Sequence, residues 1–321
     1  MGKLEAASLP LKNNKGRAEM ESRPELILVI GGTGMLGEPV VRCLREAGFP
    51  VRVLTRSLEK ARDRFEAGIE VVAGEVDDAP SLAAALSGCW GVHINLSGSF
   101  DYDLERRGAA NVALAAAKAG LQRIGYISGA SVLAENCWYA GTRAKYDAEA
   151  AIRGSGVPYT IFKATWFMET LDNFVRRPWQ ARQGGLGGKK RALHIGRHPF
   201  AYHWIAAQDY AQQVARAYAI PEAANKSFYI YGPQAYTMRQ ALQIYCRIAH
   251  PDAMHIFMPI WVAWVFATLG RREALKAALP FFSYMERVGE GGDPGEARSL
   301  LGAATTTLEE WSREKARQLA A

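Results

Sequence analysis

Cysteine is scarce in this sequence of 321 residues, and what is missing around it excludes two kinds of site. The four cysteines, Cys43, Cys89, Cys137 and Cys246, stand singly, without a C-x-x-C pair and without histidines at metal-ligand spacing. A disulfide framework and a structural zinc site are therefore excluded, and we predict no metal. Free cysteines are typical of a reducing compartment, so we expect a cytoplasmic protein.

The sequence also lacks a block of basic residues interleaved with aromatics, although its net charge is +7 and its pI is near 9.2. Such a block is the usual footprint of a nucleic-acid interface. We therefore predict no nucleic-acid partner. A cofactor that carries phosphates would account for part of the positive charge.

An apolar signal segment is missing as well. Residues 1–24 are polar and basic and are predicted to form a disordered leader. Nothing in the sequence predicts an oligomeric state.

What is present is a glycine-rich turn directly after an apolar strand. Residues 26–30 read LILVI and run into GGTGMLG, and an amphipathic helix is predicted from Glu38 to Ala47. The G-x-x-G-x-x-G spacing permits a tight turn, contact between backbone and pyrophosphate, and close packing of helix on strand. Amides at the helix N-terminus then face the phosphates. The predicted cofactor contacts here are Gly31, Thr33, Gly34, Met35, Leu36 and Gly37.

Strands and helices alternate after this turn. Buried strands are predicted at residues 50–54, 70–73, 90–96, 123–128 and 158–163, with helices between them. This alternation is typical of a parallel sheet covered by helices. We predict an α/β fold of the Rossmann type, doubly wound, in residues 25–170. Residues 171–321 are predicted to form a smaller, mostly helical substrate lobe, with some strands rejoining the core.

The end of the second strand indicates which dinucleotide binds. Folds that select NAD place an acid there for the ribose hydroxyls, whereas an arginine accommodates the extra phosphate of NADP. Here the sequence is Thr55-Arg56-Ser57, with no acid. We therefore predict that NADP(H) is preferred over NAD(H). The alternative is that Arg56 is only a surface charge.

Two further strand ends are candidates for cofactor contact. Glu75 and Val76 follow the third strand, where an adenine ring can rest, and Ser97 and Gly98 form a turn of small residues after the fourth. Ligands of open α/β folds bind at this edge of the sheet.

With these motifs in order, the chain resembles the atypical short-chain dehydrogenase/reductase superfamily, and most closely its NmrA-like branch. The resemblance rests on GGTGMLG, TRSLEKA, the helix that carries Lys145, and SGVPYTIFKATWFMETL, and it covers residues 26–249. It implies a core that binds NAD(P)H and a C-terminal lobe that closes over the nicotinamide.

The resemblance also implies a catalytic set that is incomplete here. In relatives that do redox chemistry, a tyrosine transfers a proton, a lysine four residues later lowers its pKa and holds the nicotinamide ribose, and a serine orients the carbonyl. Lys145 is present, but the tyrosine position is Gly141 and the serine position is Gly129, with Ser128 and Ser131 on either side.

Three interpretations stay open. Tyr139 reaches the site if its helix starts late, with Ser128 as the neighbouring hydroxyl. Lys145 acts alone, as in isoflavone-reductase-like relatives, if burial lowers its pKa. Or the site is non-catalytic and Lys145 only holds the ribose. A solvated Lys145 paired with Glu149 at i+4 is the structural alternative to all three.

The same resemblance places Lys163 and Ala164, at the end of the sixth strand, against the nicotinamide carboxamide. Trp166, Phe167 and Met168 follow and are predicted to line the substrate space, although an aromatic and methionine pair is more often core.

Residues 256–272 contain the longest apolar stretch, IFMPIWVAWVFATL, followed by Arg271 and Arg272. The stretch is too short to cross a bilayer. We predict a buried helix that roofs an apolar pocket, with peripheral contact to a membrane as the alternative.

Together these observations predict an NADP-dependent oxidoreductase that acts on a hydrophobic small molecule. The competing hypothesis is a protein that binds NADP(H) without turnover, as a sensor or an assembly protein, peripheral to a membrane.

Overall fold

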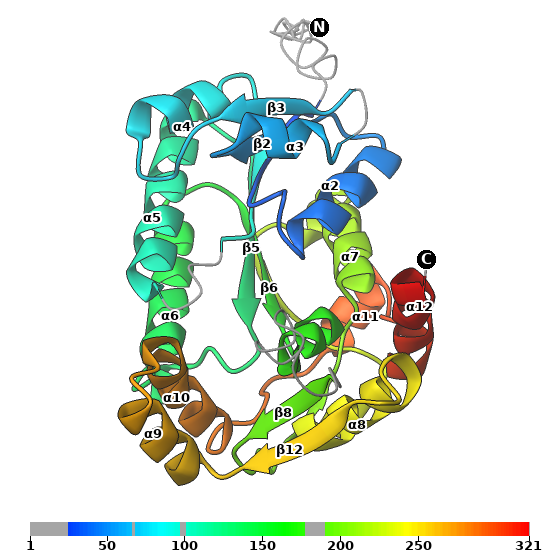
Figure 1. Cartoon of the computed structure of the whole chain (residues 1–321). Helices are drawn as coiled ribbons and strands as arrows, with labels where there is room; N and C mark the ends of the chain where they lie inside the picture. Colours follow the sequence, from blue (N-terminus) through cyan, green and yellow to red (C-terminus); the bar gives the residue numbers. More distant parts are fainter. Residues whose placement is uncertain (1–24, 66–67, 97–100, 177–189, 321) are drawn as a thin grey trace, which may run out of the picture.

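The computed structural model describes residues 25–65, 68–96, 101–176 and 190–320 (Figure 1). The leader predicted for residues 1–24 and the turn of Ser97 and Gly98 lie outside the described residues.

A seven-stranded sheet forms the centre of the molecule, in the order β10-β6-β5-β4-β1-β2-β3. Every pairing in this sheet is parallel. The strands are β1 Ile27–Ile30, β2 Val51–Thr55, β3 Glu70–Ala73, β4 Gly91–Ile94, β5 Arg123–Gly129, β6 Tyr159–Ala164 and β10 Lys226–Ile230. The order reverses between β1 and β4, as in a doubly wound fold. The predicted Rossmann-type sheet is therefore confirmed.

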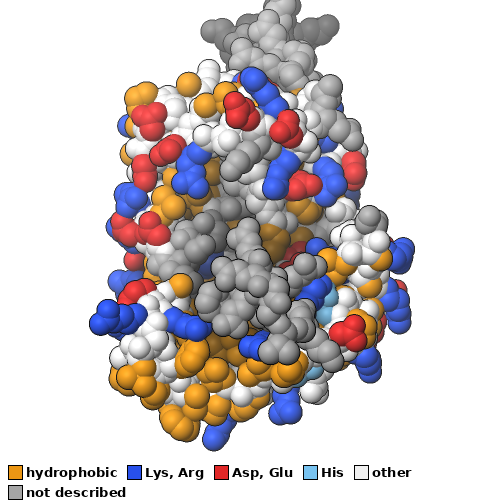
Figure 2. Space-filling model, in the orientation of Figure 1, with side chains coloured by type: hydrophobic (Ala, Val, Ile, Leu, Met, Phe, Trp, Pro, Cys, Tyr) orange, Lys and Arg blue, Asp and Glu red, His pale blue; other side chains and the backbone are white. Residues whose placement is uncertain are grey.

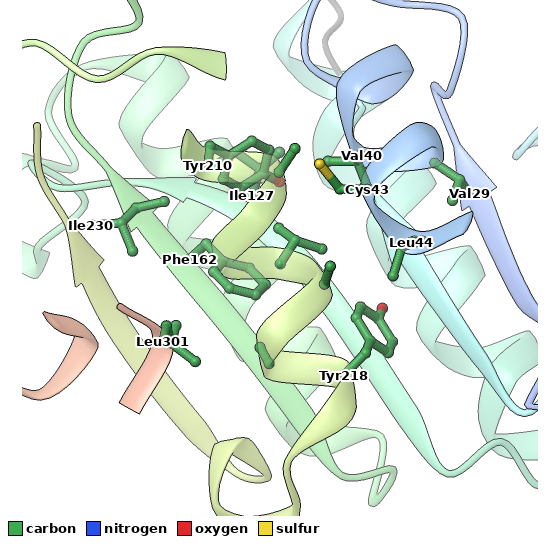
Figure 3. Close-up of a cluster of buried hydrophobic side chains, with 14 of the residues drawn as sticks. Val29, Val40, Cys43, Leu44, Ile127, Phe162, Tyr210, Tyr218, Ile230 and Leu301 are labelled. Carbon is green, nitrogen blue, oxygen red and sulfur yellow. The ribbon is translucent and has the colours of Figure 1, made fainter. Parts of the chain in front are cut away.

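Helices cover both faces of the sheet (Figure 1). On one face lie α4 (Ala79–Leu86), α5 (Tyr102–Ala119) and α6 (Ala140–Gly154), and on the other lie α2 (Gly37–Glu46) and α7 (Ala207–Ala219). The short α3 (Leu58–Arg62) connects β2 to β3. Apolar side chains of β1, β5 and β6 meet those of α2 and α7 in one buried cluster (Figure 3). Burial of this apolar area is the main stabilising term of the core.

The second half of the chain contributes to the core and also builds a separate layer. Strand β10 adds to the main sheet beside β6, and α7 packs against α2. The remaining strands form two small sheets: β12-β8-β7 from Met254–Met258, Arg191–Ile195 and Val175–Arg176, and β11-β9 from Ala235–Thr237 and Ala201–His203. The helices of this region are α8 Met238–Ala249, α9 Ile260–Leu269, α10 Glu273–Met285, α11 Gly295–Leu301 and α12 Leu308–Ala320.

The prediction for the apolar stretch 256–269 is wrong in two respects. Its first residues belong to strand β12, and the helix α9 begins only at Ile260, after Pro259. The helix is also not buried, because Trp261 is 71% exposed and Leu269 81%. Only Ala263 and Ala267 of this helix are fully buried. A roof over a pocket is therefore not what α9 forms.

None of the described helices combines the length and the apolar character needed to cross a membrane.

Candidate functional site

The turn between β1 and α2 requires glycine at two positions. Gly31 has a φ of +75°, and a Cβ built on it would lie 2.5 Å from the carbonyl oxygen of Asn95. A Cβ built on Gly37 would lie 2.1 Å from the carbonyl oxygen of Gly31. Both contacts are too short for any side chain. The turn is therefore a close backbone crossing that only glycine permits.

The same turn opens a helix that has no side-chain cap, and within the turn the Gly34 amide donates to the Gly31 carbonyl over 3.0 Å. The N-cap residue of α2, Leu36, makes no side-chain cap hydrogen bond, and Gly34 and Met35 are exposed. The carbonyl of Thr33 accepts a hydrogen bond of 2.8 Å from Arg64. An uncapped helix N-terminus favours an anion through its free N–H groups and the helix dipole. The residues present thus fit the pyrophosphate of a dinucleotide.

Beneath the turn lies a buried polar chain that the sequence patterns did not identify. The Tyr210 hydroxyl donates to Asn95 Oδ1 over 2.9 Å and lies 2.9 Å from His93 Nε2. Burial lowers the pKa of His93 to about 3, so its imidazole is neutral. Among the described residues, Asn95 Nδ2 is buried without a hydrogen-bond partner. This orphaned donor at the end of β4, beside Gly31, is a second feature that fits a ligand at this edge.

Arg56 follows β2 and its side chain is exposed. Within the described part of the chain it makes no hydrogen bond or ion pair. A guanidinium without a protein partner has all its donors available for a phosphate. The position predicted to select NADP is therefore compatible with that role.

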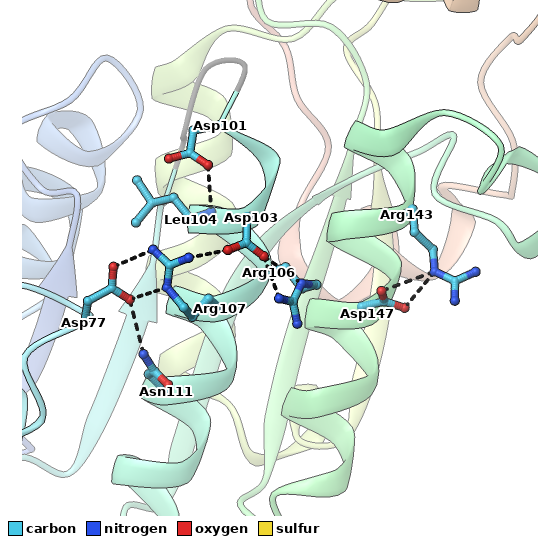
Figure 4. Close-up of polar contacts among 9 residues, drawn as sticks. All are labelled: Asp77, Asp101, Asp103, Leu104, Arg106, Arg107, Asn111, Arg143 and Asp147. Atoms are coloured by element: carbon cyan, nitrogen blue, oxygen red, sulfur yellow. Dashed lines mark hydrogen bonds and ion pairs between the residues drawn. The ribbon is translucent and has the colours of Figure 1, made fainter.

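Helix α5 fixes the segment that follows β3, where Glu75 and Val76 are predicted to contact adenine (Figure 4). Arg107 donates to both carboxylate oxygens of Asp77, over 2.9 and 2.8 Å, and lowers the pKa of that carboxyl. Asn111 donates to the Val76 carbonyl over 3.1 Å. Val76 itself is buried, whereas Glu75 is exposed. A fixed apolar side chain beside an exposed carboxylate suits a purine with its attached ribose.

Lys145 is paired across two helices. Its ammonium forms a salt bridge with the buried carboxylate of Glu105 on α5, and the Tyr126 hydroxyl donates to the same carboxylate oxygen over 3.3 Å. Pairing with Glu149 at i+4, the structural alternative for this lysine, is not observed. The Lys145 side chain keeps 28% of its surface exposed, and an ammonium has three donors. It can therefore contact a ribose while it holds Glu105.

Ser128 and Lys163 belong to a different, buried network around Glu149. The Ser128 hydroxyl donates to Glu149 Oε1 over 2.5 Å, and Lys163 Nζ lies 3.4 Å from the same oxygen. Lys163 also donates to the Val132 carbonyl over 2.8 Å, and Arg153 pairs with Glu149 over 2.8 Å. These polar groups thus already satisfy one another. Ala164, next to Lys163, ends β6, and its carbonyl accepts from Ala130.

Tyr139 occupies the space beside the missing tyrosine position. It is the N-cap residue of α6, so the helix starts directly after it. Its hydroxyl lies 2.5 Å from that of Tyr102 on α5. A Cβ built on Gly141 would lie 2.7 Å from the Tyr139 ring and 3.0 Å from the Tyr102 ring. Glycine at position 141 therefore makes room for this pair of phenols.

Other aromatic rings surround Tyr139. Tyr284 of α10 stacks on it, with ring centroids 4.5 Å apart, and Phe281 lies 6.3 Å away. Trp166 joins the group through Phe281, at 5.7 Å. A continuous series of ring contacts thus joins five residues, which we call the aromatic group: Tyr102, Tyr139, Trp166, Phe281 and Tyr284.

The other two residues predicted to line the substrate space lie in the core. Phe167 is buried against Tyr210, at 5.5 Å between ring centroids, and Met168 is buried in the cluster with Trp204. Of the predicted pocket residues, the partly exposed Trp166 is the one that reaches the aromatic group.

One edge of the sheet brings most of these groups together. All strands of the main sheet are parallel, so the turn after β1, Asn95 after β4 and the loop after β5 lie at the same carboxyl edge. Helix α6 begins at that edge with Tyr139 and runs back toward the start of β6. The turn of residues 31–37, which we call the phosphate turn, and the aromatic group therefore share the edge at which open α/β folds bind ligands.

The comparison with protein families agrees with this geometry. Residues 23–312 match the model described as the NmrA-like family. An NAD(P)H azoreductase of Xenophilus azovorans is 28% identical over 65% of this chain and 69% of its own length. A (4-alkanoyl-5-oxo-2,5-dihydrofuran-3-yl)methyl phosphate reductase of Streptomyces griseus is 32% identical over 67% and 71%. A photosystem II assembly factor, Ycf39, of Cyanophora paradoxa is 26% identical over 73% and 72%.

Solved structures share the fold. The triphenylmethane reductase of Citrobacter sp., in complex with NADP(H), superposes with a TM-score of 0.71 at 21% identity, over 90% of this chain and 99% of that one. An NADPH-dependent quinone oxidoreductase of Escherichia coli, in complex with NADPH, has a TM-score of 0.68 at 22% identity, over 90% and 99%.

Proposed function

The chain belongs to the NmrA-like family, and from that premise we propose that it is an NADPH-dependent reductase of hydrophobic, conjugated small molecules. The observation that carries the proposal is the pair of phenols, Tyr139 and Tyr102, which fills the space beside Gly141 and in which Tyr139 stacks with Tyr284.

Tyr139 is protonated at neutral pH. Burial, and then the hydrogen bond to Tyr102, raise the pKa of Tyr139 well above its usual value. A phenol with a raised pKa stays protonated at neutral pH, so Tyr139 carries a proton, but the same shift makes it a weaker acid than an ordinary tyrosine, and it would transfer the proton only as strong negative charge develops on the acceptor. Oxidation of an alcohol needs a base, whereas reduction of a conjugated acceptor needs an acid. Tyr139 thus suits the second task.

NADPH, when bound, would supply the hydride. The turn from Gly31 to Gly37 would hold its pyrophosphate, Arg56 its additional phosphate, and Lys145 its nicotinamide ribose. Tyr139 would give its proton to the atom of the acceptor on which negative charge develops. Tyr102, whose ring is partly exposed, would return a proton to Tyr139 from solvent through the hydroxyl contact.

The aromatic group indicates the class of acceptor. Tyr284 stacks on the Tyr139 ring, and Phe281 and the partly exposed Trp166 extend the series of rings, and aromatic side chains bind flat conjugated molecules well. The names of relatives support this class, because an azoreductase, a furanone phosphate reductase and a dye reductase all act on conjugated acceptors.

The test is consumption of NADPH with a quinone, an azo dye, a triphenylmethane dye and an enone. We expect turnover with at least one of them. Tyr139→Phe should lower kcat by about 100-fold, the usual contribution of a general acid, and leave the Kd of NADPH unchanged. Tyr146→Phe, an exposed tyrosine on the same helix, is the matched control. Equal kcat in Tyr139→Phe and the parent protein would contradict the proposed role.

A second function, binding of NADP(H) without turnover, is favoured by one observation. Ser128 and Lys145, two of the residues predicted to be catalytic, are engaged with the carboxylates of Glu149 and Glu105. The relative named as a photosystem II assembly factor supports the same alternative. Tight NADPH binding with no consumption across the four acceptors would favour it over the reductase.

A further inference from the structure

Helix α9 is packed in the reverse of the usual way. It buries its two smallest side chains, Ala263 and Ala267, against Ile195 and Leu279, and turns its largest ones to solvent. Trp261 is 71% exposed, Trp264 56% and Leu269 81%. Burial of such side chains normally contributes stability, so an exposed row of them is unfavourable in water. Such a helix is suited to contact with an apolar environment outside this chain.

Four of the exposed apolar residues of α9 form one face, and Phe266, also exposed, lies beside it under Arg272. Trp261, Trp264, Val265 and Leu269 follow the spacing i, i+3, i+4 and i+8, which places them on one side of a helix, and we call them the α9 face. Figure 2 shows hydrophobic side chains gathered over α9 and α10 at the lower end of the molecule, with Lys and Arg side chains around them. A groove of about 480 Å³ between α9 and α10 opens on this face and is lined by Trp261, Trp264 and Arg287 among others.

The α9 face carries almost no side chain that could hydrogen-bond to a partner protein. In the sequence of α9, IWVAWVFATL, only the two indoles and Thr268 can hydrogen-bond through side chains. The Thr268 hydroxyl already donates to the carbonyl of Trp264 over 2.8 Å. Protein interfaces use about one hydrogen bond per 100–200 Å². Indoles instead suit the boundary between hydrocarbon and lipid headgroups.

Cations follow directly at the end of the helix. Arg271, Arg272 and Lys276 are exposed, against one exposed acid, Glu273. Arg271 has a φ of +47°, a conformation that usually belongs to glycine, although Gly270 stands next to it. The left-handed conformation of Arg271 stores backbone strain at this position. Arg272 lies over the ring of Phe266, 4.4 Å from its centroid.

From these observations we propose that the α9 face binds to the surface of an anionic lipid bilayer. Trp261, Trp264 and Leu269 enter the boundary of the acyl chains, and Arg271 and Lys276 lie at the level of anionic headgroups. This orientation is independent of the reductase proposed above, because it uses none of the residues at the carboxyl edge of the sheet.

The test is co-sedimentation of the full chain with vesicles of phosphatidylcholine and phosphatidylglycerol in equal parts, and with vesicles of phosphatidylcholine alone. We expect binding to the anionic vesicles that weakens with salt. The double variant Trp261→Ala and Trp264→Ala should partition at least about tenfold less, since burial of one large apolar side chain is worth that factor. The variant Arg271→Gln and Lys276→Gln should lose about fivefold per charge on anionic vesicles only.

Leu114→Ala and Leu319→Ala, which replace exposed leucines on α5 and α12, are matched controls and should bind as the parent does. Unchanged thermal melting shows that each variant is folded. Equal partitioning of the parent and the double tryptophan variant would overturn the proposal. So would a dimer that light scattering finds in the parent and not in that variant, because a second copy would then be the occupant.

Discussion

The phosphate turn and the aromatic group lie at the same edge of the sheet but are built in different ways. The turn closes within seven residues, and its tight contacts join Gly31 to Gly37 and to Asn95 on the neighbouring strand. The aromatic group joins α5, α6 and α10, and its two closest contacts link Tyr139 to residues 37 and 145 positions away. Local backbone geometry therefore fixes where the cofactor would lie. Packing between segments that are distant in the sequence fixes which side chains would lie beside it.

The largest effect, on the affinity for NADPH, is expected at Gly31, where two backbone segments cross. Gly31→Ala places a Cβ 2.5 Å from the Asn95 carbonyl, which cannot move without displacing β4. We expect the affinity for NADPH to fall by at least about 100-fold, because each 1.4 kcal/mol of misfit is a factor of ten. Isothermal titration with NADPH measures it.

Gly48→Ala is the matched control for that change. Gly48 also has a positive φ, of +91°, but a Cβ there meets nothing within 4 Å. It should lower the free energy of unfolding by about 1 kcal/mol and leave NADPH affinity as it is. If Gly31→Ala and Gly48→Ala lost the same affinity for NADPH, strain from the positive φ would explain the result, and the contact with the Asn95 carbonyl would not.

The next effect tests the choice of dinucleotide. Arg56→Ala removes an exposed guanidinium without a protein partner in the described structure, so no internal contact is lost. A hydrogen bond to a charged group contributes about 1.5–3 kcal/mol. NADPH should therefore bind at least about tenfold more weakly, and NADH as before. Arg62→Ala, another exposed arginine nearby on α3, is the control. Equal affinities of the parent for NADPH and NADH would contradict the predicted preference.

The contrast between the two regions also explains what the sequence could predict. The turn, the parallel sheet and the helices around it follow from glycine spacing and short periodic patterns, which act over a few residues. Thr307 and Glu310 likewise form the capping box that their spacing predicts, with hydrogen bonds of 2.9 and 3.2 Å. Local geometry of this kind needs no knowledge of the rest of the fold.

Contacts between distant segments could not be predicted. Nothing near Lys145 indicates Glu105, and nothing near Ser128 indicates the network around Glu149. Nothing near Asp209 indicates that its carboxylate accepts hydrogen bonds from the amides of Thr305 and Thr306 and fixes the chain before α12. The exposure of α9 is a further case, because an apolar composition predicts burial and only the packed structure shows which side is covered.

A smaller effect should mark the aromatic group. Tyr284→Leu removes the ring stacked on Tyr139 and keeps an apolar side chain. Aromatic pairs contribute about 0.5–1.5 kcal/mol beyond buried area, so we expect the KM of an accepted substrate to rise by up to about tenfold. Steady-state kinetics at saturating NADPH measures it. Phe282→Leu, two residues away on the same helix and packed on His198, should change the KM little. A weaker affinity for NADPH in Tyr284→Leu would show that the two regions are not independent.

The last effect concerns stability rather than binding, and it tests the support beneath the phosphate turn. Burial lowers the pKa of His93 from 6.5 to about 3, so the folded protein keeps it neutral while the unfolded chain binds a proton below pH 6.5. The unfolded state then holds more protons, and stability falls as pH drops from 6.5 toward 3. Between pH 7 and 5 this one histidine should cost about 2 kcal/mol. His194, with a pKa lowered by burial to about 4, adds to the same decline.

Urea unfolding at several pH values measures this decline. In His93→Gln, the free energy of unfolding should fall by about 2 kcal/mol less between pH 7 and 5 than in the parent, whereas His255→Gln, at an exposed position of β12, should behave as the parent does. An unchanged slope in His93→Gln would mean that the imidazole titrates in the folded protein, and that the polar chain of His93, Tyr210 and Asn95 opens to solvent under the turn.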